Sequence, residues 1–182
     1  LAGDVVSIAK GETGSGVYAE AGEVTLSTIS VSSSCVGISA RNGLTLNGDV
    51  EINSADTGLG TVNGTLTINA DVTVTTNSSA AILNRGLDNG GDIIINKGVT
   101  VDWRVNGKAN DNLHKIGGGT LLVRGKGKNP GGLNIGDGVA ILNQEANADG
   151  KKQAFSTIDI VSGRPTVILK DADQIDPNKI YF

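Results

Sequence analysis

Apolar and polar residues alternate along this chain in a nine-residue unit that recurs several times. The unit is clearest in residues 44–52, where Leu-Thr-Leu is followed by Asn-Gly-Asp and then by Val-Glu-Ile. Further copies occupy residues 66–74, 93–101 and 133–141. An apolar residue at every second position predicts a half-buried β-strand, and Asn, Gly and Asp are typical of tight turns. The unit therefore predicts a strand, a corner and a second strand.

The spacing between copies predicts a solenoid. Leu44 and Leu66 are 22 residues apart, and Gly16 and Gly37 are 21 residues apart. Repetition at such a span is typical of stacked supersecondary units that share one continuous core. We therefore expect an all-β fold, a right-handed, single-stranded parallel β-helix with about 20–22 residues per rung. Leu44 is expected to stack on Leu66 inside the solenoid, while Thr45 points outward.

Composition agrees with thin apolar layers and excludes several partners. Aromatic residues make up 3% of the 182 residues, 27 residues are Gly, and the net charge is −4. The chain has no basic face for nucleic acid and no apolar run of about 20 residues that could form a membrane helix. The single cysteine, Cys35, cannot form an internal disulfide, and we expect it to be a small buried residue.

Two segments break the repeat. Residues 84–91 lengthen one rung, and residues 143–152 form a long polar loop. Insertions in solenoids project from one face, which is often the binding face. The plainer interpretation, solvated corners, is favoured. The candidate binding residues are Asn84, Arg85, Asp88, Asn89, Asn147, Asp149 and Lys151.

The sequence lacks the parts of the usual catalytic and metal sites, so we expect no catalytic residue and no cofactor. The only histidine, His114, is expected at a corner or on the surface, and one His with one Cys cannot supply the usual zinc ligands. Asp88, Asn89 and Asp92 could offer oxygen ligands to calcium, but the nonapeptide repeat of calcium-binding β-rolls is absent.

An acidic cluster leaves one enzymatic interpretation open. Asp49, Glu51 and Asp71 fall near each other when the rungs are aligned, as a β-helical polysaccharide lyase or hydrolase would require. Asp49 and Asp71 occupy equivalent corners, however, where Asp is a common turn residue. A lyase or hydrolase is therefore the least favoured of three hypotheses.

From about residue 102 onward the sequence resembles the serine protease autotransporters of Gram-negative bacteria, the group that includes the immunoglobulin A proteases. The resemblance covers roughly the last 80 residues and extends through a long series of words in order. These words are LHKIGGGTL (113–121), GKGKN (125–129), GDGVAILNQ (136–144), GKKQAFS (150–156) and VSGRPTV (161–167).

The resemblance implies a β-helical stalk in a secreted passenger. The parent would be a serine endopeptidase whose catalytic domain is absent from this chain, exported through the periplasm and outer membrane by a translocator barrel of the same parent chain. The product would be secreted or held at the bacterial cell surface. We expect one β-helix over residues 1–182, divided into a repeat region of unmatched origin (1–101) and a stalk-like region (102–182). The abrupt ends favour a piece of something longer.

The first hypothesis is thus a structural stalk that displays an effector domain and supports its secretion. The second is an adhesin-type module whose enlarged loops contact a host surface protein or glycan. Unpaired strand edges at the solenoid ends also predict end-to-end self-association.

Overall fold

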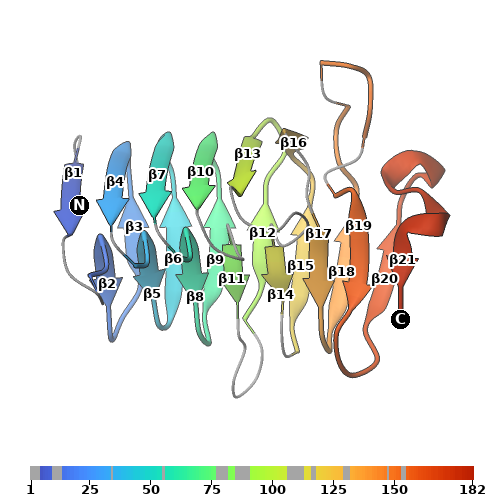
Figure 1. Ribbon diagram of the computed structural model, residues 1–182, viewed down its shortest axis with the longest axis horizontal. Helices are drawn as coiled ribbons and strands as arrows, with labels where there is room; N and C mark the ends of the chain where they lie inside the picture. The colour runs from blue at the N-terminus through green and yellow to red at the C-terminus, as the bar shows by residue number, and fades with distance from the viewer. Residues whose placement is uncertain are drawn as a thin grey trace.

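The computed structural model is a β-solenoid with its axis along the longest dimension of the molecule (Figure 1). It describes residues 5–9, 14–33, 35–54, 56–76, 82–84, 91–105, 113–115, 118–128, 132–146, 148–152 and 155–182.

The described strands form three parallel sheets. Sheet A contains β1 (Val5–Ala9), β4 (Ile29–Ser33), β7 (Val50–Ser54), β10 (Val72–Thr76), β13 (Thr100–Val105) and β16 (Lys126–Lys128). Sheet B contains β2 (Val17–Ala19), β5 (Ile38–Ala40), β8 (Leu59–Thr61), β11 (Ile82–Asn84), β14 (Leu113–Lys115), β17 (Gly132–Ile135), β19 (Thr157–Ile160) and β21 (Ile180–Tyr181). Sheet C contains β3 (Val24–Leu26), β6 (Gly43–Leu46), β9 (Thr65–Ile68), β12 (Ile93–Ile95), β15 (Thr120–Val123), β18 (Val139–Leu142) and β20 (Thr166–Leu169).

The chain visits the sheets in a fixed order, which confirms the predicted parallel β-solenoid. From β1 to β18 it passes from sheet A to sheet B to sheet C and then begins the next rung. Each strand pairs in parallel with its counterparts in the adjacent rungs. Handedness stays a prediction, supported by the strong preference of parallel crossovers for the right hand.

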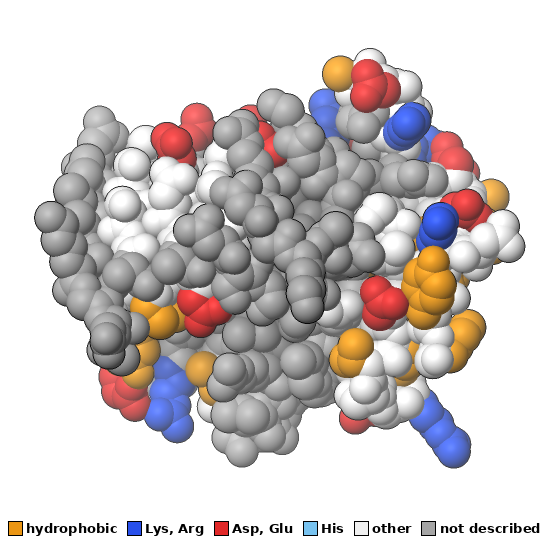
Figure 2. Space-filling view, viewed as in Figure 1, with side chains coloured by type: hydrophobic (Ala, Val, Ile, Leu, Met, Phe, Trp, Pro, Cys, Tyr) orange, Lys and Arg blue, Asp and Glu red, His pale blue; other side chains and the backbone are white. Residues whose placement is uncertain are grey.

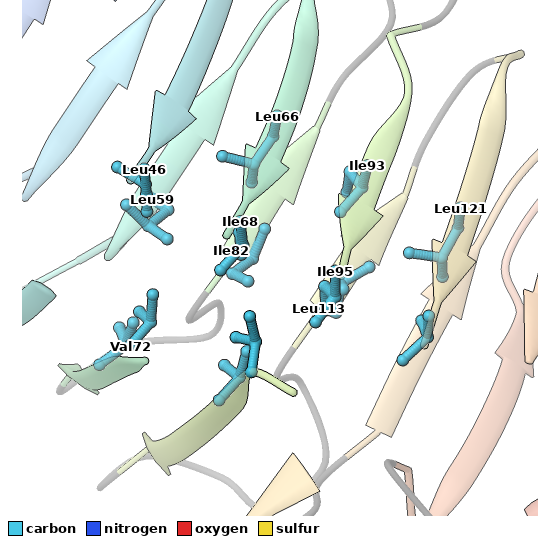
Figure 3. Packing of buried hydrophobic residues seen from close by; sticks show 14 of the residues in the cluster. Leu46, Leu59, Leu66, Ile68, Val72, Ile82, Ile93, Ile95, Leu113 and Leu121 are labelled. Atoms are coloured by element: carbon cyan, nitrogen blue, oxygen red, sulfur yellow. The ribbon is translucent and has the colours of Figure 1, made fainter. Parts of the chain in front are cut away.

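Alternate side chains fill the interior as apolar ladders (Figure 3). Leu44 pairs with Leu66 and Ile52 with Val74, as predicted, and all four are at most 1% exposed. Val, Ile and Leu suit this arrangement because they pack closely on a pleated surface. The stacked rungs therefore share one narrow core.

The predicted rung length holds only in the first part of the chain. Between β2 and β10 the paired residues are 20 to 22 positions apart, as in Val24↔Leu44 and Val50↔Val72. Farther on, the separation ranges from 19 in Thr120↔Val139 to 31 in Ile82↔Leu113. Rungs can lengthen because extra residues leave at corners, where they disturb no strand pairing.

The predicted fourth copy of the repeat is wrong. Residues 133–141 run from β17 in sheet B to β18 in sheet C, whereas residues 44–52 run from sheet C to sheet A. The strand that stacks on Ile93–Ile95 is Leu121–Val123. The error has a physical reason: every corner of a solenoid joins two alternating strands, so the pattern alone does not identify the corner.

Sheet A ends at β16, while sheets B and C continue. The chain passes from β18 in sheet C directly to β19 in sheet B, and from β20 to β21 through two short 3-10 helices, Ala172–Gln174 and Pro177–Lys179. Phe155 and Ile175 in these connections are at most 1% exposed and join the core. Loops thus replace the third wall. In the described residues no helix has the length and apolarity to cross a membrane.

Candidate functional site

The loop that follows β18 is the best-described candidate site, and it projects from the solenoid in Figure 1. Hydrogen bonds from backbone nitrogens to side-chain oxygens fix its first turn. The Gln144 amide nitrogen donates to Gln174 Oε1 at 2.8 Å, and the Gly98 nitrogen donates to Glu145 Oε2 at 2.8 Å. The loop is therefore tied both to the next rung and to an earlier corner.

Charged contacts fix both ends of the same loop. Lys97 Nζ lies 3.8 Å from Glu145 Oε1 at the start of the loop. At its end, Lys152 Nζ donates a hydrogen bond to Asp171 and lies 3.9 Å from Asp173 Oδ1. The hydrogen bond to Asp171 raises the pKa of Lys152 above its ordinary value, and both carboxylates favour its charged form. Each such exposed pair stabilises the fold weakly, but together they define where the loop leaves the body.

Two of the predicted binding residues lie at the tip of this loop. Asp149 and Lys151 are exposed, and Gly150 between them has a φ of 77°. Positive φ is readily adopted by Gly, so the local sequence favours a tight turn there. Asn147, Arg85, Asp88 and Asn89, and the side chain of Asn84, lie outside the described residues.

Three acidic residues at described corners cap backbone nitrogens of the next rung. Asp71 Oδ1 accepts from the Thr100 nitrogen at 2.7 Å, and Asp92 Oδ1 accepts from the Thr120 nitrogen at 2.7 Å. Asp137 Oδ1 accepts from the Arg164 nitrogen at 3.1 Å. These bonds give Asp71 the structural role that was favoured over a catalytic one.

Cys35 differs from expectation, and His114 differs in part. Cys35 is half-buried rather than buried, because it lies in a corner between β4 and β5 instead of in a strand. His114 lies within β14, paired with Leu83 and Asn134, and not at a corner. Its side chain lies outside the described residues, so the alternative, a surface position, stays a prediction. Among the described residues no three His, Cys, Asp or Glu residues are grouped to hold a metal.

A hollow of about 240 Å³ lies beside β5 and β8. Its described lining offers hydroxyl groups and a single carboxylate, that of Asp56, which is no acid–base pair for hydrolysis. The lining residues are Val36, Ser39, Asp56, Thr57, Gly60, Thr61 and Val62.

An asparagine ladder runs along the corner between sheets C and A and was not predicted. Asn69 Nδ2 donates to Asn47 Oδ1 at 2.8 Å, Asn96 donates to Asn69, and Arg124 donates to Asn96. The signal was in the sequence, because each Asn holds the same place in the repeat.

A buried lysine was also missed. Lys115 is 1% exposed, and its Nζ donates to the Gly118 carbonyl. Burial lowers the pKa of Lys115, and the charge of Asp92 opposes that shift. Its position two residues after buried Leu113 was the available signal, since alternate residues share a face.

Charge on the visible face is mixed. Acidic and basic side chains lie next to each other at the C-terminal end, with apolar side chains among them, and again at the lower edge of the N-terminal end (Figure 2). Among the described side chains visible on this face, no patch of one sign stands out.

Comparisons with known proteins confirm the resemblance to serine protease autotransporters. Over 93 residues, 51% of this chain, the sequence is 60% identical to the serine protease SepA autotransporter of Shigella flexneri. It is 55% identical to the adhesion and penetration protein autotransporter of Haemophilus influenzae and 50% identical to the IgA-specific serine endopeptidase autotransporter of Neisseria gonorrhoeae, again over 51% of this chain. The matched stretch spans only 6% to 7% of those proteins. No protein-family model and no solved structure matches the chain.

Proposed function

We propose that this chain is part of the β-helical stalk of an autotransporter passenger, and that the stalk displays a serine endopeptidase domain located elsewhere in the parent protein. The observation that carries this proposal is the high identity of half the chain to serine protease autotransporters, combined with its parallel β-solenoid fold. The parent is exported to the cell surface or secreted, through the outer-membrane barrel of the same chain.

The architecture suits this mechanical role. Each rung contacts only its neighbours, so a solenoid extends by adding rungs without enlarging its core. A rung that stacks on an already folded one gains backbone hydrogen bonds and buries apolar surface at once. Stacking outside the cell would therefore hold the exported chain there and set the distance of an attached domain from the membrane.

The proposal is tested by expressing this chain between a reporter enzyme and an outer-membrane barrel in a Gram-negative host. The intact chain is expected to give surface reporter activity. Ile93→Asp with Leu121→Asp places two charges inside the core ladder and should reduce that activity about tenfold, because a buried unpaired charge opposes stacking. Thr67→Asp, on the outer face, is the matched control. Equal display by all three chains would refute a stacking-dependent role.

A second function, adhesion to a host surface protein or glycan, is favoured by the loop after β18. Its two ends are anchored by Glu145 and Lys152, so its tip is presented on a firm base. Replacing residues 146–151 with a short Gly-rich turn should abolish binding to host cells or glycan arrays and leave reporter display intact. Binding that survives this replacement would exclude the loop as the adhesive element.

A further inference from the structure

The outward face of sheet C changes character along the solenoid. In β3, β6 and β9 its central residues are Thr25, Thr45 and Thr67. In the next strands the same register position holds Ile94, Leu122, Ile141 and Ile168. We call these last four residues the sheet C stripe. Sheet C lies behind sheets A and B in the view of Figure 1.

The stripe is contiguous and reaches solvent. Each of its residues is the direct parallel partner of the next, so with strands about 4.8 Å apart the row is about 15 Å long. Ile168 is 37% exposed, and the other three are half-buried. Four β-branched or leucine side chains in an unbroken outward row differ from the isolated exposed apolar residues that are normal on protein surfaces.

The two borders of the stripe carry opposite charge. Asp92 and Asp137 precede the strands β12 and β18, while Arg124 and Lys170 follow β15 and β20. Arg164 on the first border and Glu145 on the second have the opposite sign, and Glu145 is engaged by Gly98 and Lys97. The first border is therefore mainly acidic and the second mainly basic.

We propose that the sheet C stripe is a self-association surface, on which a second copy of this chain packs side by side with its solenoid axis parallel. A second copy presents apolar side chains with the same strand-to-strand period, so the two rows can face each other along their whole length. Sheets packed face to face in this way lie about 10 Å apart.

Charge selects the orientation. A twofold axis along the solenoid places each stripe residue opposite its own counterpart and brings the acidic border of one copy over the basic border of the other. A twofold axis along the strands would bring like borders together, which is unfavourable. The parallel arrangement follows from this difference, and it is distinct from end-to-end association through strand edges.

The area of the sheet C stripe limits the affinity of the proposed dimer. Stable protein–protein interfaces bury about 1,200–2,000 Å² in total, and a row four residues long covers less than that. We therefore expect a weak dimer that forms at high concentration.

Sedimentation velocity over a concentration series tests the proposal. The wild-type chain should show a concentration-dependent dimer. Leu122→Lys with Ile141→Lys should shift its Kd at least tenfold upward, because charges would face each other across the contact. Thr45→Lys with Thr67→Lys, on the same face of the preceding rungs, is the matched control and should shift it less. A wild-type chain that stays monomeric at every concentration, or equal loss in both variants, would overturn the proposal.

Cross-linking gives the orientation without depending on those lysine variants. In a Cys35→Ser background, Leu122→Cys should be linked to itself by a short bismaleimide reagent, whereas Tyr18→Cys on exposed sheet B should not. A mixture of the Ile94→Cys and Ile168→Cys chains should give few mixed dimers. Abundant mixed dimers would show antiparallel packing, and dimers with no link at position 122 would show end-to-end association; either result contradicts the parallel arrangement.

Discussion

The early and late rungs of this solenoid bury different kinds of polar residue. Among the described residues of the early rungs, the buried polar side chains are the hydroxyl residues Ser54, Thr57, Thr61 and Thr76. In the late rungs they include charged and amide side chains. These are Asp102, Lys115, Asn134, Gln144 and Gln174. The late rungs also have irregular lengths, and sheet A ends within them.

The difference has a consequence for how the chain finds its register. Rungs of nearly equal length with interchangeable Val, Ile and Leu ladders can slip by one whole rung with little loss of apolar packing. Gln174 Oε1 accepts from the Gln144 nitrogen of the preceding rung, and a buried polar group that loses such a partner is unfavourable by about 1–3 kcal/mol. We infer that the late rungs fix the register of the solenoid, while the early rungs extend it.

The largest expected effect comes from the residue that fills the place of sheet A in the late rungs. Phe155 is fully buried, and truncating a buried Phe costs about 3–5 kcal/mol. Phe155→Ala should therefore lower the free energy of unfolding by that amount in a urea titration. Hydrogen exchange should show the loss in β17, β19 and β21 first.

Tyr18→Ala is the matched control for Phe155→Ala, since Tyr18 is an aromatic residue that is 60% exposed. Its effect should be below about 1 kcal/mol. Protection lost equally in early and late rungs of the Phe155 variant would show that the solenoid unfolds as one unit. That result would remove the distinction between the two regions.

A glycine of the early rungs gives the next effect. A Cβ on Gly37 would lie 2.4 Å from Ile52 Cγ2 and 2.5 Å from the Gly58 carbonyl oxygen. Gly37→Ala should therefore destabilise by about 1–3 kcal/mol through overpacking. At Gly43 the nearest atom would be 3.4 Å away, so Gly43→Ala should change the unfolding midpoint much less. Equal midpoints for the two variants would contradict the close stacking of rungs.

The sequence predicts the early rungs well and the late rungs poorly, for a physical reason. The alignment of Leu44 with Leu66 could be read directly, because both are inward residues of rungs with equal length. The pairing of Ile93 with Leu121 could not, because each corner can absorb extra residues without altering the strands. The replacement of sheet A was equally hidden, since Phe155 follows a loop with no periodicity.

The candidate loop after β18 was likewise predictable in part. The loop at 143–152 was predictable as a long polar interruption, but its anchors to Gly98, Gln174 and Asp171 are contacts across rungs. Such contacts depend on the rung register, which one sequence does not reveal in the irregular region.

Removing the buried charge of the late rungs should stabilise the protein. Lys115 stacks on Ile135, so Lys115→Met keeps an unbranched side chain in an apolar ladder and should raise the free energy of unfolding by about 1 kcal/mol at pH 7. The pH dependence checks the cause. Burial lowers the pKa of Lys115 in the folded state below 10.5, its ordinary value in the unfolded chain. At a pH between the folded and the unfolded pKa, the unfolded chain therefore binds more protons than the folded chain. Wild-type stability relative to the variant should therefore rise with pH in that window. A constant difference would mean that the lysine is not desolvated.

The smallest effect tests the asparagine ladder, which starts at Asn47 in the early rungs and reaches Arg124 in the late rungs. Asn69 is both a donor and an acceptor in the ladder, through Asn47 and Asn96. Asn69→Ala removes both bonds at an exposed corner and should destabilise by about 1 kcal/mol, the usual net contribution of such bonds. Asn143, at the corresponding corner beyond Arg124, is exposed and is the control position. If Asn143→Ala lowered the urea midpoint as much as Asn69→Ala, a general preference for Asn at corners would explain both. A loss confined to Asn69 would show instead that the ladder itself couples successive rungs, from the regular region into the irregular one.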